Sequence, residues 1–574
     1  MYFGLQDVLA LPLASWIAWL SIFNGTRDSR TCKTIPGDAT WPSDTEWSNF
    51  NQSIGGRLIR TTPIAQSCHA PHYDGSKCAH VKAQWHSSAL HSESSSSMMT
   101  PFFANLSCDP FTRPEDPCVL GTYVQYAVNV SRRVHIYKTL DFVRKHNIRF
   151  VVRNTGHDYM GKSTGANALA IWTHHLQETR WIEDFVSPAY RGVAVKAQAG
   201  VTAEVLYEQA DRRGYAVVGG GCPTVGMAGG YIQGGGHSLL GSTYGLAADQ
   251  TLSFEVITTQ GEFLVASPTQ NHDLYWALSG GGGGTYGIVW SVTIKAHKDS
   301  PVTIAAIEFT SEDVSSDTFW AGINAYHAST PSYTAAGGFA VATYTPAFFR
   351  LMGLVLPNLT SPAAAPLVQP LLTRLDELGI KYTSSLATHP GFLNASQDFT
   401  SRGDFSVGAW HFGSGRLLPR TLWSDPDAFK RMTRVIRDVI EDGGMTFDVA
   451  ISPSLDAAGN PDNAVLPAWR EAERLFVPML PWDDYASWPE ILKARDKVTW
   501  AFGEPLRQLT PDSGAYLNEA DTSEPDWKTA FYGRNYARLL AIKDHYDPDQ
   551  LLYGSTAVGG DRWAEVDAGR LCPV

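Results

Sequence analysis

The spacing of hydrophobic residues predicts strands separated by glycine-containing turns between Cys118 and about His297. Ile148–Val152 is an unbroken apolar run that ends at a glycine-containing loop, as a buried strand does. Leu252–Thr258 and Glu262–Ala266 flank the turn residues 259–261, which indicates a hairpin. The same patterns predict three further elements, which are strands at Val193–Ala199 and Trp290–Lys295 and a helix at Thr202–Gly214.

After residue 300 the pattern changes, and longer helices alternate with strands. Phe339–Tyr344 and Met445–Ile451 are predicted strands, and Asp425-Pro426 begins a helix that ends at Gly443. One face of this helix carries Phe429, Met432, Ile436 and Val439. Further helices are expected at Leu367–Leu378 and at about Asn535–His545. This part of the chain is therefore a separate α+β unit.

Composition places the chain among compact globular proteins. It has 574 residues, of which 44% are hydrophobic and 18% charged, the latter against about 25% in an average protein. These values exclude a disordered, collagen-like or coiled-coil protein, and the length favours two or more domains that share a cleft. The net charge is −12 without a long basic run, so no nucleic-acid partner is expected.

The N-terminus carries a candidate secretory signal. Val8–Phe23 holds 16 residues without a charge, which is shorter than the roughly 20 needed to cross a bilayer. The segment fits the apolar core of a signal peptide, although residues 1–7 lack Lys and Arg. A buried or membrane-anchoring N-terminal helix is the alternative. Six glycosylation acceptor motifs also favour the secretory pathway and an extracellular protein; they begin at Asn24, Asn51, Asn105, Asn129, Asn358 and Asn394.

Seven cysteines, an odd number, are concentrated near the N-terminus. Residues 31–117 are rich in Ser, Thr, Pro and His, and we expect this segment to be loop-like. Within it, Cys68/Cys78 and Cys108/Cys118 are each ten residues apart, which is typical of short disulfide loops. No cysteine spacing fits a zinc site, so no metal is expected.

Three glycine motifs suggest chemistry that their surroundings do not support. Gly156–Ser163 satisfies the Walker A pattern, but a turn and a predicted strand at Ala168–Trp172 follow it instead of a helix. The same loop contains Gly161–Gly165, which has the form of a nucleophile elbow but again lacks the flanking strand and helix. Gly282–Gly287 fits GxGxxG, yet it leads into a strand, so a Rossmann site is disfavoured.

Glycine is concentrated in four clusters, and one long ligand would explain them together. Glycine lets the backbone approach a ligand closely and adopt positive φ, so that its N–H groups can surround a pyrophosphate without a helix. Plain tight turns are the alternative. We favour a cofactor cradle built from Gly156–Gly165, Gly219–Gly221, Gly226–Gly245 and Gly280–Gly287.

The segments RNTGHDYMGKSTG, GGGCPTVGMAGGYIQGGGHS, STYGLAADQ and SGGGGGTYGIV resemble the FAD-binding domain of the vanillyl-alcohol oxidase/PCMH flavoproteins. More narrowly, they resemble berberine bridge enzyme-like oxidases of the fungal isoamyl alcohol oxidase-like branch, as does the tail from Tyr516 to Trp563. The resemblance implies an α+β fold: a PCMH-type FAD-binding domain of two α/β subdomains, and a substrate domain with an antiparallel sheet covered by helices. It implies the boundaries 1–30 (signal or anchor), 31–117 (disulfide-rich extension), 118–300 (FAD-binding domain), 301–510 (substrate domain) and 511–574 (segment returning to the FAD domain).

The resemblance also implies how FAD would be held. His157 would bond to the flavin 8α-methyl group and Cys222 to flavin C6, and both side chains are nucleophiles suited to this chemistry. Asp249, Gly287 and Val289 would border the FAD. The remaining residues implied to contact the cofactor are Arg153, Asn154, Thr155, Gly156, Asp158, Thr224, Val225, Gly226, Gly229, Gly230, Gly234, Gly235, Gly236 and His237.

The implied reaction is oxidation of an alcohol or related donor, with a small-molecule substrate and O2 as partners and H2O2 released. Val225 favours an oxidase, because in related enzymes valine at this position accompanies oxygen access. Candidates for the base are Tyr516, Asn518 and Glu519, for which a hydrogen-bonded loop is the alternative role. There are two rival functions. One is a tailoring enzyme that closes a ring or desaturates a secondary metabolite, and the other is an FAD-binding protein without activity. We expect a monomer.

With Cys222 assigned to the flavin by the resemblance, six cysteines remain for three disulfides. Cys32 and Cys572 would then form a pair that joins the two ends of the chain.

Overall fold

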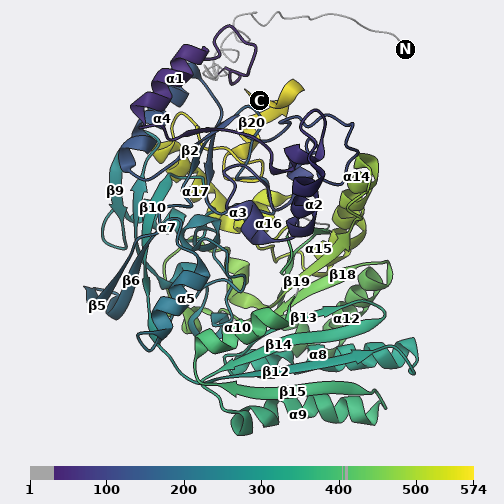
Figure 1. Ribbon diagram of the computed structural model, residues 1–574. Coiled ribbons are helices and arrows are strands. Elements are labelled where there is room, and N and C mark those ends of the chain that lie inside the picture. Colours follow the sequence, from purple (N-terminus) through teal and green to yellow (C-terminus); the bar gives the residue numbers. More distant parts are fainter. Residues whose placement is uncertain (1–30, 404, 408–410) are drawn as a thin grey trace, which may run out of the picture.

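The structure is a computed structural model that describes residues 31–403, 405–407 and 411–574 (Figure 1). The signal segment expected at Val8–Phe23 and the acceptor Asn24 lie outside these residues. None of the described helices combines the length and apolar character that a bilayer crossing requires. The mixture of helices with largely antiparallel sheets confirms the α+β class.

Two sheets form the upper part of the molecule in Figure 1. The first has the order β1-β2-β4-β3, in which β2, β4 and β3 run parallel. The second is antiparallel, with the order β5-β6-β10-β8-β9. Their strands are β1 Leu58–Arg60, β2 Tyr126–Asn129, β3 Phe150–Arg153, β4 Leu169–Trp172, β5 Thr179–Ser187, β6 Tyr190–Gln198, β8 Thr251–Ile257, β9 Phe263–Ala266 and β10 Ile288–Lys295.

The hairpin and the strands expected here are all present, and α5 Ala203–Asp211 is the expected helix. Helices α4 Arg133–His146 and α7 His272–Leu278 complete this part. The C-terminal segment, with α16 Trp527–Tyr532 and α17 Tyr536–Tyr546, packs here too. Leu551 and Leu552 share a core with Ile148 and Phe150.

An eight-stranded antiparallel sheet forms the lower part, in the order β15-β12-β14-β13-β18-β19-β16 with β17 paired to β19. The strands are β12 Val302–Thr310, β13 Phe339–Tyr344, β14 Phe348–Pro357, β15 Tyr382–His389, β16 His411–Gly413, β17 Arg416–Pro419, β18 Met445–Ala450 and β19 Ala472–Pro481. Helices α8 Ser316–Ala335, α9 Ser361–Glu377 and α12 Pro426–Glu441 cover one face (Figure 1).

Alternate side chains of β13 pack on the two faces of this sheet, and the two faces have different neighbours. Ala340, Ala342 and Tyr344 pack into the core formed with the three covering helices. Phe339 and Val341 point to the opposite face, where they belong to the core shared with the upper part. Because successive side chains of a strand point to opposite faces, one face is free to border a cavity.

The expectation of loops throughout residues 31–117 is wrong. Three helices form there, namely α1 Asp44–Ser53, α2 Gly75–Gln84 and α3 Ser88–Ser92. Ser43 and Glu46 make a reciprocal capping box at the start of α1, and the Asp74 carboxylate caps α2. These short polar caps initiate helices that weak hydrophobic periodicity does not reveal.

All three expected disulfides are present: Cys32–Cys572, Cys68–Cys78 and Cys108–Cys118. Cys222 is the free cysteine of the described residues.

Candidate active site

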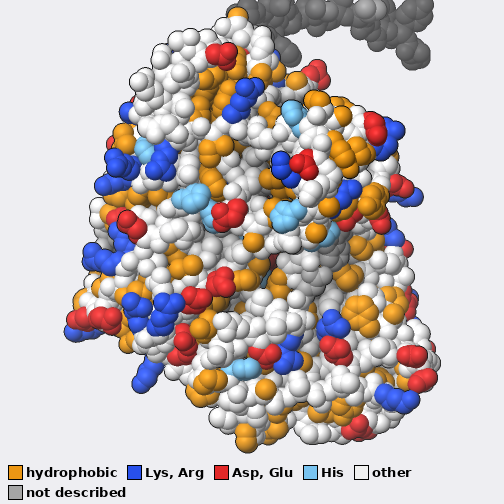
Figure 2. Space-filling model, viewed as in Figure 1, with side chains coloured by type: hydrophobic (Ala, Val, Ile, Leu, Met, Phe, Trp, Pro, Cys, Tyr) orange, Lys and Arg blue, Asp and Glu red, His pale blue; other side chains and the backbone are white. Residues whose placement is uncertain are grey.

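A cavity of about 500 Å³ lies between the glycine loops of the upper part and the uncovered face of the eight-stranded sheet. Figure 2 shows the surface hollowed between these two parts, with acidic and basic side chains interspersed over the face in view. The C-terminal segment Tyr516–Thr522 forms the third part of the cavity wall. The cavity is therefore assembled from segments far apart in sequence.

The loop after β3 forms one wall. Asn154, Thr155, Gly156, His157 and Asp158 line the cavity, as predicted for cofactor-contacting residues. Gly156 has φ +87, and a Cβ there would come within 2.5 Å of the Arg153 guanidinium, so glycine is required at this turn.

Arg153 itself lies outside the cavity wall, unlike the other predicted residues of this loop. Its guanidinium is buried and donates hydrogen bonds to the carbonyl oxygens of His91 (3.1 Å) and Ser97 (2.5 Å). This arginine therefore connects the N-terminal extension to the loop through its Nη2 group.

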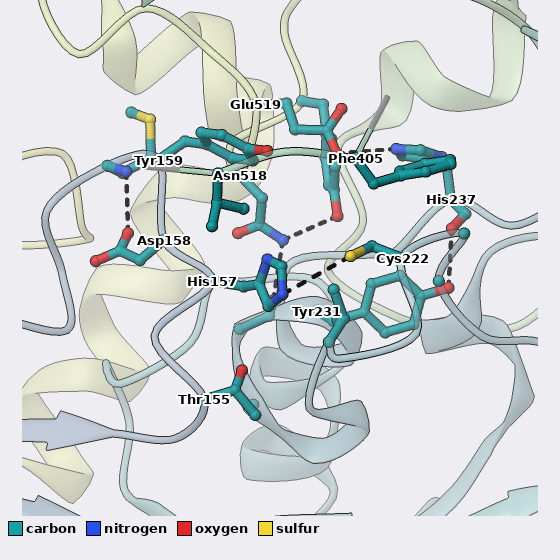
Figure 3. Close-up of a pocket in the computed structure, with 18 of the residues that line it drawn as sticks. Thr155, His157, Asp158, Tyr159, Cys222, Tyr231, His237, Phe405, Asn518 and Glu519 are labelled. Atoms are coloured by element: carbon teal, nitrogen blue, oxygen red, sulfur yellow. Dashed lines mark hydrogen bonds and ion pairs between the residues drawn. The ribbon is translucent and has the colours of Figure 1, made fainter. Parts of the chain in front are cut away.

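His157 and Cys222 meet on the wall, with Nε2 and Sγ 3.8 Å apart (Figure 3). Thr224 does not line the cavity but lies behind this pair, with its hydroxyl 2.5 Å from His157 Nε2. Burial lowers the pKa of His157 to about 4 and raises the pKa of the Cys222 thiol. At neutral pH the imidazole is uncharged and nucleophilic, and the thiol must lose its proton as it bonds.

Glycines 226–230 and 280–287 come together as a backbone cradle. A Cβ on Gly283 would lie 2.7 Å from the Gly230 Cα, and Cβ atoms on Gly226 and Gly229 would meet the Asn154 amide at 2.6 and 2.9 Å. The space beside the backbone is thus closed to side chains but open to a ligand that uses the N–H groups. Among the residues expected to contact the cofactor, those that line the cavity here are Val225, Gly226, Gly229, Gly230, His237, Gly287 and Val289.

Gly234, Gly235, Gly236 and Asp249, which were also expected to lie along the FAD, are not among the residues that line the cavity. A Cβ on Gly234 would meet the Asn518 amide at 2.4 Å, and one on Gly236 would meet the Tyr231 ring. Asp249 is buried and pairs with Arg470 at 2.7 Å. These residues lie behind the cavity wall, where they contact other protein groups.

Tyr516, Asn518 and Glu519 all line the cavity. Burial and the neighbouring Glu519 raise the pKa of Tyr516, which favours the neutral hydroxyl over the ionised side chain. Asn518 donates to the Tyr516 hydroxyl (2.9 Å) and to the Gly230 carbonyl (3.0 Å), and an amide does not titrate. Glu519 Oε1 lies 3.0 Å from His237 Nε2.

Sequence reasoning missed the residues that the eight-stranded sheet and α10 (Phe392–Arg402) contribute. Alternation in β13 identified two faces but not which face borders a cavity. Tyr159, Lys162 and Tyr231 were also missed, although they lie inside the recognised motifs. The additional residues include Phe339, Val341, Arg350, Met352, Phe399 and Phe405.

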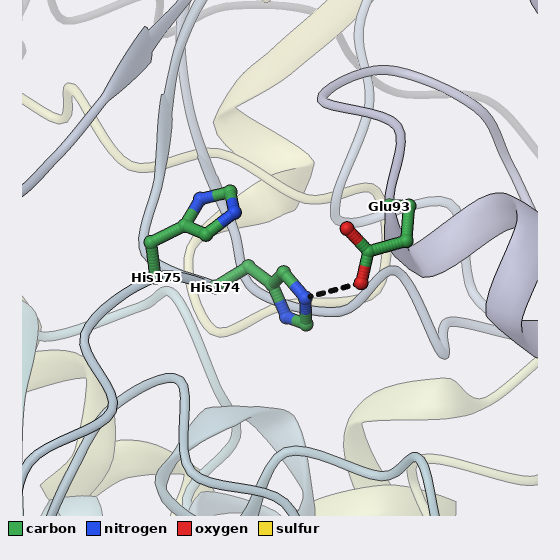
Figure 4. Close-up of side chains that lie close together, drawn as sticks. All are labelled: Glu93, His174 and His175. Carbon is green, nitrogen blue, oxygen red and sulfur yellow. Dashed lines mark hydrogen bonds and ion pairs between the residues drawn. The ribbon is translucent and has the colours of Figure 1, made fainter.

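A second cluster of polar side chains lies outside this cavity. His174 and His175 follow β4 and approach Glu93 of the N-terminal extension (Figure 4). His174 Nε2 is 3.4 Å from the Glu93 carboxylate, and His175 Nδ1 is 3.1 Å from the Asn129 side-chain oxygen. These contacts connect the extension to the parallel sheet.

Comparison with known proteins agrees with the geometry. A family model described as "FAD binding domain" matches residues 124–267, and one described as "Berberine and berberine like" matches residues 515–558. The chain is 44% identical to the FAD-linked oxidoreductase sor8 of Hypocrea jecorina, covering 100% of this chain and 98% of that protein. It is 43% identical to the FAD-linked oxidoreductase patO of Aspergillus clavatus, covering 95% of each.

The crystal structure of the VAO-type flavoprotein MtVAO615 from Myceliophthora thermophila C1 superimposes with a TM-score of 0.90 at 37% identity, over 95% of this chain and 100% of that one. The fold, the glycine cradle and these similarities together assign the cofactor class. The chain belongs to the FAD-linked oxidoreductases of the vanillyl-alcohol oxidase and berberine bridge enzyme-like type.

Proposed function

We propose that this oxidoreductase is an oxidase that acts on an alcohol-type donor, with FAD attached through both His157 and Cys222. The observation that carries the proposal is the 3.8 Å approach of the Cys222 thiol to the His157 imidazole on the wall of one glycine-lined cavity. Imidazole and thiol are the two nucleophiles that such a double attachment needs. Both line the cavity where the backbone cradle would receive the cofactor.

In this arrangement the cofactor would supply the redox chemistry, and the protein would bind and orient the cofactor and the donor. When bound, FAD supplies the two-electron acceptor for the donor and passes the electrons to O2, which gives H2O2. The backbone of 154–158 and 226–230 would hold it, and the sheet residues Phe339, Val341 and Met352 would enclose an apolar donor. Val225 lines the cavity, consistent with access for oxygen.

Acid precipitation tests the double attachment. Flavin should stay with the precipitated protein in the intact chain and in Cys222→Ala, because His157 still holds it. The double variant Cys222→Ala/His157→Ala should release it. Peptide mapping that finds Cys222 without flavin, or in a disulfide, contradicts the proposal.

Peroxide formation tests the oxidase activity. A panel of primary, secondary, allylic and benzylic alcohols is incubated with the enzyme under air, and H2O2 is measured alongside anaerobic bleaching of the flavin. An oxidase produces both signals with the same donors. Bleaching without peroxide indicates a dehydrogenase, and a yellow protein that no donor bleaches is an inert binder.

A ring-forming or desaturating tailoring reaction is the second candidate. The bifunctional decalin synthase calF of Penicillium decumbens is 39% identical to this chain, covering 96% of each. An apolar, aromatic-lined cavity also suits a polycyclic precursor. Product analysis separates the candidates, since oxidation of an alcohol gives a carbonyl whereas cyclisation gives an isomer or a dehydrogenated ring.

We also propose that the protein is made in the secretory pathway. Three disulfides support this location, because such bonds persist in oxidising compartments. Asn105, Asn358 and Asn394 are exposed, whereas Asn129 is part of strand β2 and is only partly exposed. Secreted protein treated with an N-glycosidase should show modification at the three exposed sites and none at Asn129.

A further inference from the structure

His237 and Glu519 form a pair on the cavity wall that no covalent attachment of the cofactor uses. Their Nε2 and Oε1 atoms are 3.0 Å apart, and the side chains are 12% and 23% exposed. His237 ends the glycine-rich loop 226–236, whereas Glu519 belongs to the C-terminal segment (Figure 3). The pair therefore joins two of the three parts that build the cavity.

The pairing leaves hydrogen-bonding capacity unused. His237 Nδ1 and Glu519 Oε2 are buried, and neither has a hydrogen-bond partner within the described part of the chain. Buried polar atoms are rarely unpaired, and unpaired ones often occur where a ligand or a catalytic group completes the network. A carboxylate beside an imidazole also orients the ring through the nitrogen that faces it.

The imidazole is held in a fixed orientation. The Tyr231 hydroxyl donates to the His237 carbonyl oxygen at 2.8 Å. The Phe339 ring lies nearly parallel to the imidazole at 6.3 Å, and the Tyr516 ring meets it edge-on at 5.5 Å. This packing limits the rotation of His237, so it fits a group that must meet a substrate atom in one geometry.

The pair also lies near the thiol proposed to hold the flavin. Cys222, His237 and Glu519 all line this cavity. Figure 3 shows His157, Cys222, His237 and Glu519 around the same space. A donor bound in this cavity would therefore meet the pair.

Other titratable groups on the wall are engaged elsewhere. The Asp158 carboxylate accepts hydrogen bonds from the backbone of Met160 and Ser163. Arg350 pairs with Glu308, and Arg402 pairs with Asp398. Lys162 lines the cavity near Asp158, and burial lowers its pKa to about 8, so it is mostly charged and a poor proton acceptor at neutral pH.

We propose that His237, supported by Glu519, is the proton acceptor for the donor's hydroxyl group. The O–H proton moves to the imidazole, and Glu519 stabilises the resulting cation. With the flavin as two-electron acceptor, the loss of this proton and of a hydride from the adjacent carbon would convert the alcohol into a carbonyl compound. The neutral Tyr516 hydroxyl is a hydrogen-bond donor for the reacting oxygen. This assignment rests on the proposed function.

Ionisation of a bound phenol tests the assignment without turnover. The probe is 4-nitrophenol, whose phenolate has a distinct visible absorption, and the enzyme is the flavin-loaded protein. At a pH below the ordinary pKa of the probe, the intact enzyme should bind it as phenolate. His237→Asn and Glu519→Gln should each lower the ratio of ionised to neutral probe at least about tenfold, the equivalent of one pKa unit.

The matched control is His175→Asn, the same substitution at an exposed position outside the cavity, which should ionise the probe like the intact enzyme. In the variants that retain flavin, anaerobic bleaching by a donor found in the alcohol panel should slow by about 10²–10⁴-fold. Unchanged ionisation and bleaching in His237→Asn, or a probe left neutral by the intact enzyme, overturn the assignment.

Failure of this assignment is distinguishable from failure of the proposed function. Acid-stable flavin and peroxide formation are measured on the intact enzyme and do not depend on which residue takes the proton. An intact enzyme that forms peroxide, together with a fully active His237→Asn variant, contradicts the role of the pair alone.

Discussion

At the scale of single residues, the site relies on uncharged nucleophiles. Burial keeps His157 neutral, with a pKa of about 4, and keeps the Cys222 thiol protonated. A cationic imidazole could not attack the flavin, so burial prepares this residue for bond formation. The protonated thiol would be less reactive, so in the proposed double attachment the bond to His157 would form before the bond to Cys222.

Replacing Gly283 by alanine should weaken cofactor retention. The added Cβ would lie 2.7 Å from the Gly230 Cα, a backbone contact that cannot be relieved by a side-chain rotation. Forcing the two glycine segments apart should destabilise the protein by about 1–3 kcal/mol. The bound flavin per protein, read from the absorption of purified samples, should fall together with the melting temperature.

Gly75→Ala serves as the control for this substitution. Its Cβ would meet the Tyr73 hydroxyl at 3.6 Å, an ordinary contact at the start of α2 and outside the cavity lining. We expect unchanged flavin content there. Full flavin loading in Gly283→Ala would show that the two segments are not in contact in the loaded enzyme.

The motifs predicted these residues better than they predicted the orientation of individual side chains. Glycine-rich segments that lined the cavity were identified from sequence because close backbone approach demands glycine. Arg153 and Asp249 belong to the same motifs, yet one bonds to the N-terminal extension and the other to Arg470. A motif identifies the path of the backbone, whereas the direction of each side chain depends on partners distant in sequence.

At the scale of elements, the two faces of the eight-stranded sheet have different roles: one packs against helices, and the other borders the cavity. The pattern of hydrophobic positions predicted β13, β18 and α12 correctly. It could not predict which face of the sheet borders the cavity, since both faces of β13 are apolar. That choice depends on where three helices pack, which is a tertiary property.

A buried ion pair connects the elements of this sheet. Arg474 on β19 pairs with Asp448 on β18, and both side chains are fully buried. Tyr344 on β13 donates to Asp448 at 2.8 Å, and Arg474 also bonds to Thr330 on α8. Arg474→Met should therefore cost about 3–5 kcal/mol in the free energy of unfolding, because it leaves a buried carboxylate unpaired. Equilibrium urea unfolding measures this loss.

Two further variants isolate the cause of that loss. Adding Asp448→Asn to Arg474→Met removes the unpaired charge and should recover part of the stability. Arg437→Met breaks a partly exposed pair of α12 with Asp317 and Glu441, which should cost no more than about 1 kcal/mol. A loss in Arg474→Met no larger than in Arg437→Met would contradict a structural role for the buried pair.

At the scale of the whole molecule, the active cavity depends on the two ends of the chain being held in place. The N-terminal extension holds the loop before His157 through Arg153, and the C-terminal segment supplies Tyr516, Asn518 and Glu519. The cysteines and the family motifs predicted this closure, but the helices of residues 31–117 were not predicted because capping, rather than periodicity, specifies them.

The Cys32–Cys572 disulfide should therefore stabilise the molecule more than a local disulfide does. Its cysteines are 540 residues apart, against 10 for Cys68–Cys78. The chain-entropy relation gives about 6 kcal/mol for the long loop and about 3 kcal/mol for the short one. We expect Cys32→Ser/Cys572→Ser to lower the urea midpoint further than Cys68→Ser/Cys78→Ser. Asp38 and Arg570 pair at 2.7 Å beside the long-range bond, so the double variant retains one link between the ends. Equal losses in the two variants would show that the ends are held together without the disulfide, by packing and by this ion pair.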